Sequence, residues 1–198
     1  MKKSLGAGTY LSPTPAWLIG SYSDEGKPNI MTAAWAGICN SNPPCVFVSL
    51  QKPRATYANI LKTKAFTINV ASTKNWLETD YAGIVSGKKH DKFEETGFTA
   101  VKSQIVDAPY VEECPLVAEC KVIQTIDLGS HTVFIGEILD VKVDENTIDE
   151  QGKVDMKKVS PILFGTTDRQ YYGVGENLGQ GFTVQNVDGS LVSIERKK

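Results

Sequence analysis

The segment LVAECKVIQTIDLGSHTVFIGEILDVKV, residues 116 to 143, constrains the fold most, because it consists of two long β-like runs joined by Gly129-Ser130. Glycine in the first position of a two-residue loop is typical of a type II′ turn between antiparallel strands. This turn predicts four facing pairs: Leu128 with His131, Ile126 with Val133, Cys120 with Leu139, and Ala118 with Val141. Apolar residues then share one face of a long hairpin, and His131 lies at its tip on the inward face.

Other runs of β-like sequence predict more strands around this hairpin. The segments 16–22 and 29–38 flank the polar turn SDEGKP and predict a second hairpin. The run CVFVSL, residues 45–50, is almost entirely apolar, as in a strand that is buried on both faces. The run FTINVA, residues 66–71, predicts another strand. Many strands with few helices favour a mainly β fold, an all-β barrel with peripheral helices.

Three short helices are expected between the strands. Residues 54–64 have apolar side chains at helical spacing, with Pro53 just before the start. Residues 75–85 begin with Asn75 and Glu78 at the spacing of a capping box. In the third helix, residues 90–97, Asp91 is placed to cap the start and Gly97 to end it.

Composition limits the partners and the compartment. The 198 residues carry a formal net charge of −2, so no global basic field attracts nucleic acid or an anionic membrane. The four cysteines have no metal-like spacing with either histidine and are expected to be reduced thiols. The proline-broken N-terminal sequence does not resemble a secretory leader, and no apolar run is long enough to span a bilayer. We expect a cytoplasmic protein with no metal site.

The junction after CVFVSL concentrates groups that favour an anion. Lys52 and Arg54 flank Pro53 where the predicted helix begins, and Ser49 and Thr56 add hydroxyl groups nearby. The free N–H groups of a helix start, together with two cations, suit a dianionic phosphate. The alternative is a solvated helix start with ordinary surface cations.

The strand upstream offers a surface for a flat ring. Residues 32–37, TAAWAG, have small side chains apart from Trp35, which would let a ring approach the backbone and its hydrogen-bonding groups. Close packing against a helix is the alternative reason for such small side chains.

These motifs also match a family. The succession GKPNIMTAAWAGICNSNPPCVFVSLQKPRATYANI, FTINV, SGKKHDKF and GSHTVFIGEI resembles flavin reductase-like FMN-binding split-barrel proteins, and most closely the flavoredoxin branch. The resemblance runs from about Ser4 to Phe182. It implies a six-stranded split barrel of Greek-key type in residues 1–182. It also implies a homodimer that binds FMN near the subunit interface. Residues 183–198 have no counterpart and are treated as a tail, in which Asp188-Gly189 could turn a short hairpin.

The resemblance assigns roles to individual positions. The isoalloxazine ring would lie along Asn29, Met31, Thr32, Ala33, Ala34 and Trp35. The ribityl chain and phosphate would contact Ser49, Leu50, Lys52, Arg54 and Thr56, with a second contact region at Ser86 and Lys92. His131 resembles a histidine that is kept close to the flavin or the nicotinamide, although a lone histidine at a hairpin tip is also often a surface residue.

Two function classes remain open at this point. The first is an FMN-dependent oxidoreductase that takes electrons from NADH or NADPH and reduces a flavin, a ferric complex or a quinone-like acceptor. The second is a non-catalytic electron carrier that exchanges electrons with redox protein partners through bound FMN. A split barrel without FMN, acting as a binding module, is a distant third.

Overall fold

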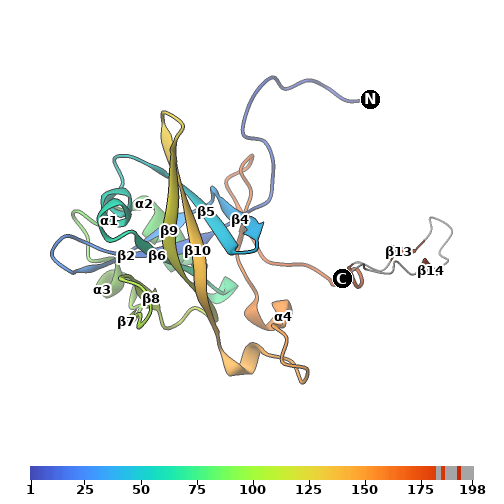
Figure 1. The fold of residues 1–198 in the computed structure, drawn as a ribbon. Coiled ribbons are helices and arrows are strands. Elements are labelled where there is room, and N and C mark those ends of the chain that lie inside the picture. The colour runs from blue at the N-terminus through green and yellow to red at the C-terminus, as the bar shows by residue number, and fades with distance from the viewer. Residues whose placement is uncertain (182–183, 186–190, 193–198) are drawn as a thin grey trace.

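Seven antiparallel strands form the central sheet, in the order β3-β2-β6-β9-β10-β5-β4 (Figure 1). The computed structural model describes residues 1–181, 184–185 and 191–192. The strands and helices in chain order are β1 Thr14–Pro15, β2 Trp17–Tyr22, β3 Pro28–Ala33, β4 Ala36–Ser41, β5 Pro44–Gln51, α1 Ala55–Thr63, β6 Ala65–Val70, η1 Thr73–Asn75, α2 Trp76–Ile84, α3 Lys92–Thr96, β7 Ala100–Lys102, β8 Pro109–Val111, β9 Leu116–Asp127, β10 His131–Val143, η2 Glu145–Thr147, α4 Met156–Val159, β11 Leu163–Phe164, β12 Tyr171–Tyr172, β13 Val184–Gln185 and β14 Leu191–Val192. The mainly β fold is therefore confirmed, with seven strands in the main sheet where the resemblance implied six.

The two edge strands of this sheet are forced together by a short connection. A flat sheet of seven strands would separate its edges by about 29 Å, at about 4.8 Å between neighbours. Only Ala34 and Trp35 join β3 to β4, and such a link spans at most about 11 Å. The sheet must therefore curl into a barrel. The Ser49 amide donates to the Trp35 carbonyl at 2.8 Å, which continues the β4–β5 pairing into the bend. No strand ladder joins β3 to β4 in the described residues, so the seam between these two edges stays open.

The sequence predicted one strand over residues 29–38, and the structure divides it. β3 ends at Ala33 and β4 begins at Ala36, so the two halves lie at opposite edges of the sheet. The run of small residues marks a bend between two strands, because small side chains permit the backbone to turn without steric conflict.

The long hairpin is present, and two irregularities alter its register. The pairs Ile126–Val133 and Ala118–Val141 are confirmed, and the Leu128 amide donates to the His131 carbonyl across the turn at 2.8 Å. Between these pairs, however, Cys120 lies opposite Ile138 and not opposite Leu139. One irregularity in each strand shifts the register and then restores it.

These irregularities also change which face is buried. Phe134 is fully buried and Thr132 is 5% exposed, so the core lies on their side of β10. His131 and Val133 point to the opposite face. The prediction that His131 lies on the core-facing side of the hairpin is therefore wrong. The apolar Ile126–Val133 pair does not mark the core face, because a bulge places it on the face opposite to Cys120.

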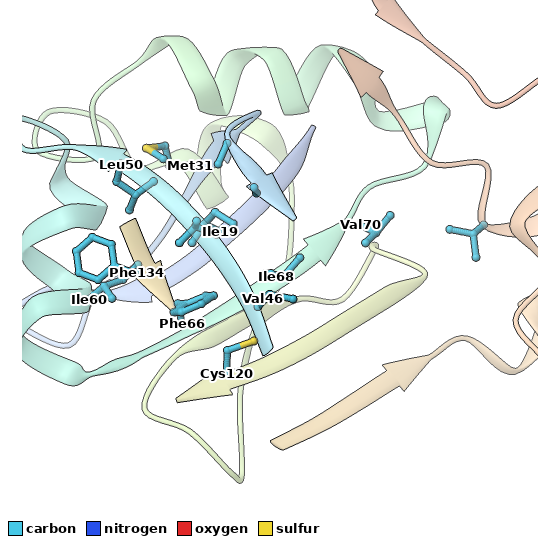
Figure 2. Packing of buried hydrophobic residues seen from close by; sticks show 14 residues of the cluster. Ile19, Met31, Val46, Leu50, Ile60, Phe66, Ile68, Val70, Cys120 and Phe134 are labelled. Carbon is cyan, nitrogen blue, oxygen red and sulfur yellow. The ribbon is translucent and has the colours of Figure 1, made fainter. Parts of the chain in front are cut away.

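The barrel core lies between the sheet and α1 (Figure 2). Phe66, Phe134 and Ile60 are fully buried there, and the Tyr57 ring packs edge-on against Phe134 with a centroid distance of 5.5 Å. α1 begins after Arg54, as predicted, and has no acidic residue in its first turn. Its N-terminal N–H groups are therefore not neutralised by a carboxylate of that turn.

The other predicted helices are present, and one of their two predicted caps is confirmed. Asp91 accepts a hydrogen bond from the Glu94 amide at the start of α3, and Gly97 ends that helix with φ +73°. Asn75 precedes α2 but makes no side-chain cap hydrogen bond, so the capping box predicted with Glu78 is wrong.

The cysteines and the end of the chain complete the fold. All four cysteines are free thiols, as expected, and three of them are buried. No described helix has the length and apolar character needed to cross a bilayer. β13 and β14 pair as two short antiparallel strands, whereas the predicted turn at Asp188-Gly189 lies outside the described residues.

Candidate functional site

A cavity of about 200 Å³ lies at the open seam, between the β3–β4 bend and the β5–α1 turn. It is lined by Met31, Thr32, Ala33, Ala34, Trp35, Ser49, Leu50, Gln51, Arg54 and His131. The structure thus brings together three segments that are distant in sequence. Among these residues only Gln51 was not predicted from the sequence. It faces His131 across the β5–β10 ladder and could not be found without that register.

The β3–β4 bend forms the first wall of the cavity. Met31 and Ala33 point toward the core, where they are 6% and 5% exposed. Thr32 and Ala34 alternate with them and are more exposed. The Thr32 hydroxyl donates to the Thr79 carbonyl of α2, which fixes this wall against the helix. The small side chains leave backbone groups accessible beside Trp35, which is 36% exposed.

Two cations converge on the last turn of α2. The Arg54 Nη1 atom donates to the Gly83 carbonyl at 3.1 Å, and the Lys92 Nζ atom donates to the Ala82 carbonyl at 2.6 Å. The final carbonyls of a helix lack intrahelical partners and carry partial negative charge, so they attract cations. Neither side chain forms an ion pair with a carboxylate of the described residues.

Lys92 is unusually buried for a lysine, at 3% exposed. Burial, and then the charge of the nearby Arg54 guanidinium, lower the pKa of Lys92 to about 8. Two like charges are therefore held close together in a desolvated place, and the carbonyls of α2 compensate them only in part. An anion bound between them would relieve this repulsion.

A buried amide lies beside the start of α1. The Asn29 Nδ2 atom donates to the Thr56 hydroxyl at 2.9 Å, and Thr56 is 1% exposed. The Asn29 Oδ1 atom is buried without a hydrogen-bond partner. A Cβ atom on Gly87 would lie 1.9 Å from this Oδ1, so the loop backbone approaches as closely as only glycine allows. The structure therefore joins Asn29, expected beside the ring, to Thr56, expected beside the phosphate, and both lie outside the set of residues that line the seam cavity.

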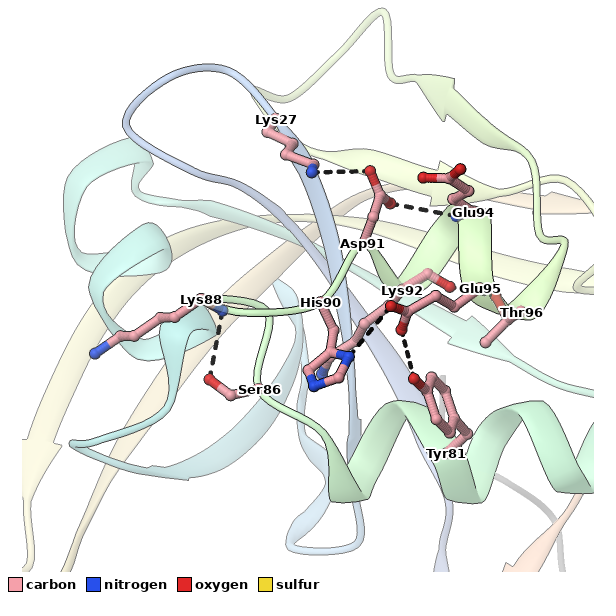
Figure 3. A network of polar contacts seen from close by, with 10 residues as sticks. All are labelled: Lys27, Tyr81, Ser86, Lys88, His90, Asp91, Lys92, Glu94, Glu95 and Thr96. Carbon is pink, nitrogen blue, oxygen red and sulfur yellow. Dashed lines mark hydrogen bonds and ion pairs between the residues drawn. The ribbon is translucent and has the colours of Figure 1, made fainter.

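The loop before α3 is fixed by polar contacts that the sequence analysis did not identify (Figure 3). Lys27 and Asp91 form an ion pair at 2.9 Å. The Lys27 ammonium lowers the pKa of the Asp91 carboxyl. His90 pairs with Glu95 at 3.2 Å, and Tyr81 donates to the same carboxylate. These contacts tie the loop and α3 to the β2–β3 turn and to α2, on both sides of Lys92. Ser86 lies at the start of the loop, where its hydroxyl accepts from the Lys88 amide at 3.4 Å.

Lys52 lies apart from the other two cations. Its Nζ atom pairs with the Asp127 carboxylate at 2.6 Å, at the tip of the β9–β10 hairpin. Both side chains are about half exposed, so this is a surface ion pair that joins the hairpin to the β5–α1 turn. Lys52 is only two positions from Arg54 in the sequence, yet its charge is already paired with Asp127.

His131 lines the cavity from the outer face of the hairpin. Its Nδ1 atom lies 3.0 Å from the Ser130 hydroxyl. A second, mostly apolar cavity of about 450 Å³ adjoins this region and shares Ala34, Trp35 and Ser49 with the first.

Comparisons with known proteins show the family and the fold of the chain. The model of the "Flavin reductase like domain" family matches residues 9–173, which is most of the chain. The chain belongs to the flavin reductase-like family. The match includes both walls of the seam cavity, the two converging cations and the β9–β10 hairpin.

Solved structures of similar sequence share the whole fold. The flavoredoxin of Desulfovibrio vulgaris (Miyazaki F) is 50% identical, with a TM-score of 0.88, and the alignment covers 92% of this chain and 98% of that one. A flavoredoxin from Methanosarcina acetivorans is 32% identical, with a TM-score of 0.82, covering 92% and 95%. An uncharacterized protein of Archaeoglobus fulgidus is 33% identical over 79% of this chain and 87% of its own length.

The depressed pKa of Lys92 predicts how stability depends on pH. Its folded pKa of about 8 lies below the usual value of 10.5, so between these values the unfolded chain binds more protons than the folded one. The free energy of unfolding of the protein without ligand should therefore rise as the pH increases from 8 to 10, by about 1–3 kcal/mol from this residue. Lys92→Met should remove this rise.

Urea denaturation of the two proteins across this range measures the effect. The difference between them isolates Lys92 from other titrating groups. A wild-type protein and a Lys92→Met variant with parallel pH profiles would show that Lys92 is not held as a desolvated cation.

Proposed function

We propose that the chain binds FMN at the seam and transfers electrons through it. The phosphate would lie at the start of α1 between Arg54 and Lys92, with Thr56 as a further hydroxyl donor. The supporting observation is the pair of cations that converge on α2 without a carboxylate partner in the described residues. A dianionic phosphate would supply the negative charge that compensates these two cations, and the dipole of α1 favours it further.

The remainder of the site fits the rest of the cofactor. A flat ring would lie against the Thr32–Trp35 backbone, with Ser49 and Leu50 beside the ribityl chain. The Oδ1 atom of Asn29 is a buried acceptor without a hydrogen-bond partner. A hydroxyl group or a ring N–H group of the cofactor could donate to it. Ser86 lies in the loop that covers this region. The name of one FMN-binding protein of the same fold, from Thermus thermophilus, states the cofactor directly.

The chain's own residues would bind and orient, and need not act as nucleophiles. FMN, when bound, accepts two electrons as a hydride and can return them singly. Arg54 and Lys92 would hold the phosphate end, the bend at Ala34 would leave one ring face accessible, and Trp35 would shield its border. His131 could hold or donate a proton at the cavity rim, because an imidazole ring nitrogen can either accept or donate a hydrogen bond.

Two uses of such a site are compatible with it. As an oxidoreductase, the protein would accept electrons from NADH or NADPH and pass them to a flavin, ferric or quinone-like acceptor. As a carrier, it would exchange electrons with a redox protein, and the similarity to two flavoredoxins favours this use. The free cysteines are consistent with a reducing compartment such as the cytoplasm.

We further propose that a second copy of the chain covers the outer face beside the site. Ile38 and Leu128 are 75% and 65% exposed, and Ile126 and Trp35 are 40% and 36% exposed. Leu128 and Trp35 line the apolar cavity that adjoins the seam cavity. A homodimer would bury this surface and exclude water from the ring.

Arg54→Ala should weaken FMN binding by about 1.5–3 kcal/mol, the range for a hydrogen bond to a charged group. Lys52→Ala should weaken it by less than about 1 kcal/mol, because its partner Asp127 already pairs with it at the surface. Titration of flavin fluorescence measures both affinities. Equal losses in the two variants would place the phosphate away from the start of α1.

Rapid mixing of the FMN-loaded protein with NADH or NADPH separates the enzyme from the carrier. For the enzyme we expect prompt loss of flavin absorbance, and for His131→Ala we expect slower loss or a shifted pH dependence with FMN still bound. An absorbance that stays constant for minutes with both nucleotides would exclude the nicotinamide-dependent enzyme and leave the carrier.

Sedimentation velocity tests the homodimer. The wild type should sediment as a dimer, and Leu128→Glu should shift it toward the monomer by placing a charge in the apolar surface. Ile105→Glu is the matched control, since Ile105 is 47% exposed on a loop outside that surface. A wild type that remains monomeric at micromolar concentration would contradict the proposal.

A further inference from the structure

A second groove runs from the seam along α2. Trp76, Asp80 and Gly83 lie at helical spacing on one side of α2, and β12 with its preceding loop lies opposite. Two adjoining cavities of about 390 Å³ and 300 Å³ form the groove, and they share Asp80, Arg169 and Tyr171. The groove shares α2 with the phosphate end of the proposed FMN site, because the Gly83 carbonyl accepts from Arg54. Its opposite side comes from β12 and the loop before it.

Aromatic rings form much of the groove surface. The Trp76 and Tyr171 rings have centroids 6.3 Å apart with an interplanar angle of 46°. Trp76 is 47% exposed and Tyr172 is 46% exposed, which is unusual for such large apolar side chains in a cavity wall. Exposed aromatic faces of this kind are suited to stacking with a planar ring.

Polar contacts fix these rings in place. The Tyr171 hydroxyl donates to Asp80 at 2.9 Å, and the Tyr172 hydroxyl bonds to Asp168. Burial and the Asp80 carboxylate raise the pKa of Tyr171, so its hydroxyl stays protonated as a donor. The second Asp80 oxygen can still accept a hydrogen bond from a ligand.

Arg169 supplies the charge of the groove. It forms no ion pair within the described part of the chain, although Asp168 is its neighbour in sequence. Its backbone has φ +56° and its amide donates to the Gly165 carbonyl at 2.9 Å, so a tight and locally strained loop presents it. Residues held in such conformations are concentrated at ligand-binding positions.

The groove is continuous with the seam cavity. The nearer of its two cavities includes Thr32 and Ala34, which also line the wall proposed to contact the flavin ring. A molecule bound along α2 would therefore extend toward that ring.

We propose that this groove binds the small-molecule redox partner of the flavin, a planar aromatic ring that carries one anionic group. The ring would stack beside Trp76 and Tyr172, and the anionic group would pair with Arg169. This proposal rests on the proposed FMN function. The same chemistry is present in the adenylate half of a nicotinamide dinucleotide and in an aromatic carboxylate, and the experiment distinguishes them.

Calorimetric titration of the FMN-loaded protein tests the proposal. The probes are adenosine 5′-monophosphate and benzoate, each compared with its uncharged counterpart, adenosine or benzamide. At least one anionic probe should bind about tenfold more tightly than its counterpart, as expected for one charged hydrogen bond. Preference for the nucleotide would identify the adenylate of a dinucleotide, and preference for benzoate a small aromatic acid.

Variants localise the binding. Arg169→Gln should abolish the tenfold advantage of the anionic probe while leaving the uncharged probe unaffected. Lys102→Gln removes an exposed cation of β7 that lines neither cavity, and it should change nothing. Anionic probes that bind Arg169→Gln as tightly as wild type, or that displace FMN, would overturn the proposal, as would the absence of binding.

Parallel titration with FMN separates the two proposals. FMN that binds normally to a protein without affinity for either probe would refute the groove and leave the proposed function standing. A protein that fails to bind FMN would refute the function whatever the probes do.

Discussion

The site depends on an uncompensated pair of positive charges. Arg54 and Lys92 come from different parts of the chain and both bond to carbonyls in the last turn of α2. Helix carbonyls carry only partial charge, so they hold the two cations without neutralising them. Arg54 immediately precedes α1, so the free N–H groups at the start of that helix add positive potential nearby. Arg54, the buried Lys92 and the start of α1 each contribute positive potential, so together they favour a bound anion at this place.

The barrel seam explains why a flat ring can lie beside these charges. The two-residue link at Ala34-Trp35 forces the sheet edges together, yet no ladder seals them in the described residues. Backbone groups at the bend therefore remain accessible where a closed barrel would have consumed them in hydrogen bonds. The same curvature brings β5, α1 and the tip of the β9–β10 hairpin to one place. The two-residue connection between β3 and β4 thus determines both the barrel topology and the position of the proposed FMN site.

Sequence reasoning succeeded where neighbouring residues determine the outcome. Pro53 and Arg54 define the start of α1, and Asp91 and Gly97 define the limits of α3, because helix ends depend on local hydrogen bonds. It failed where a distant element decides. The pairing of Cys120 with Leu139 was wrong, since irregularities on both strands shifted the register. The Asn75 cap was wrong because capping needs a specific backbone geometry that spacing alone does not ensure.

The sequence by itself determined the mainly β architecture, the family resemblance and the segments that line the seam. The tertiary structure decided which of the three cations Lys52, Arg54 and Lys92 are free to bind an anion. Lys52 and Arg54 are two positions apart and carry the same charge, but Lys52 reaches Asp127 while Arg54 turns toward α2. Lys92 joins Arg54 only because the loop before α3 folds back against the β2–β3 turn, where Asp91 pairs with Lys27. The sequence determines which side chains carry a charge. Whether an opposite charge neutralises them depends on distances that only the folded chain sets.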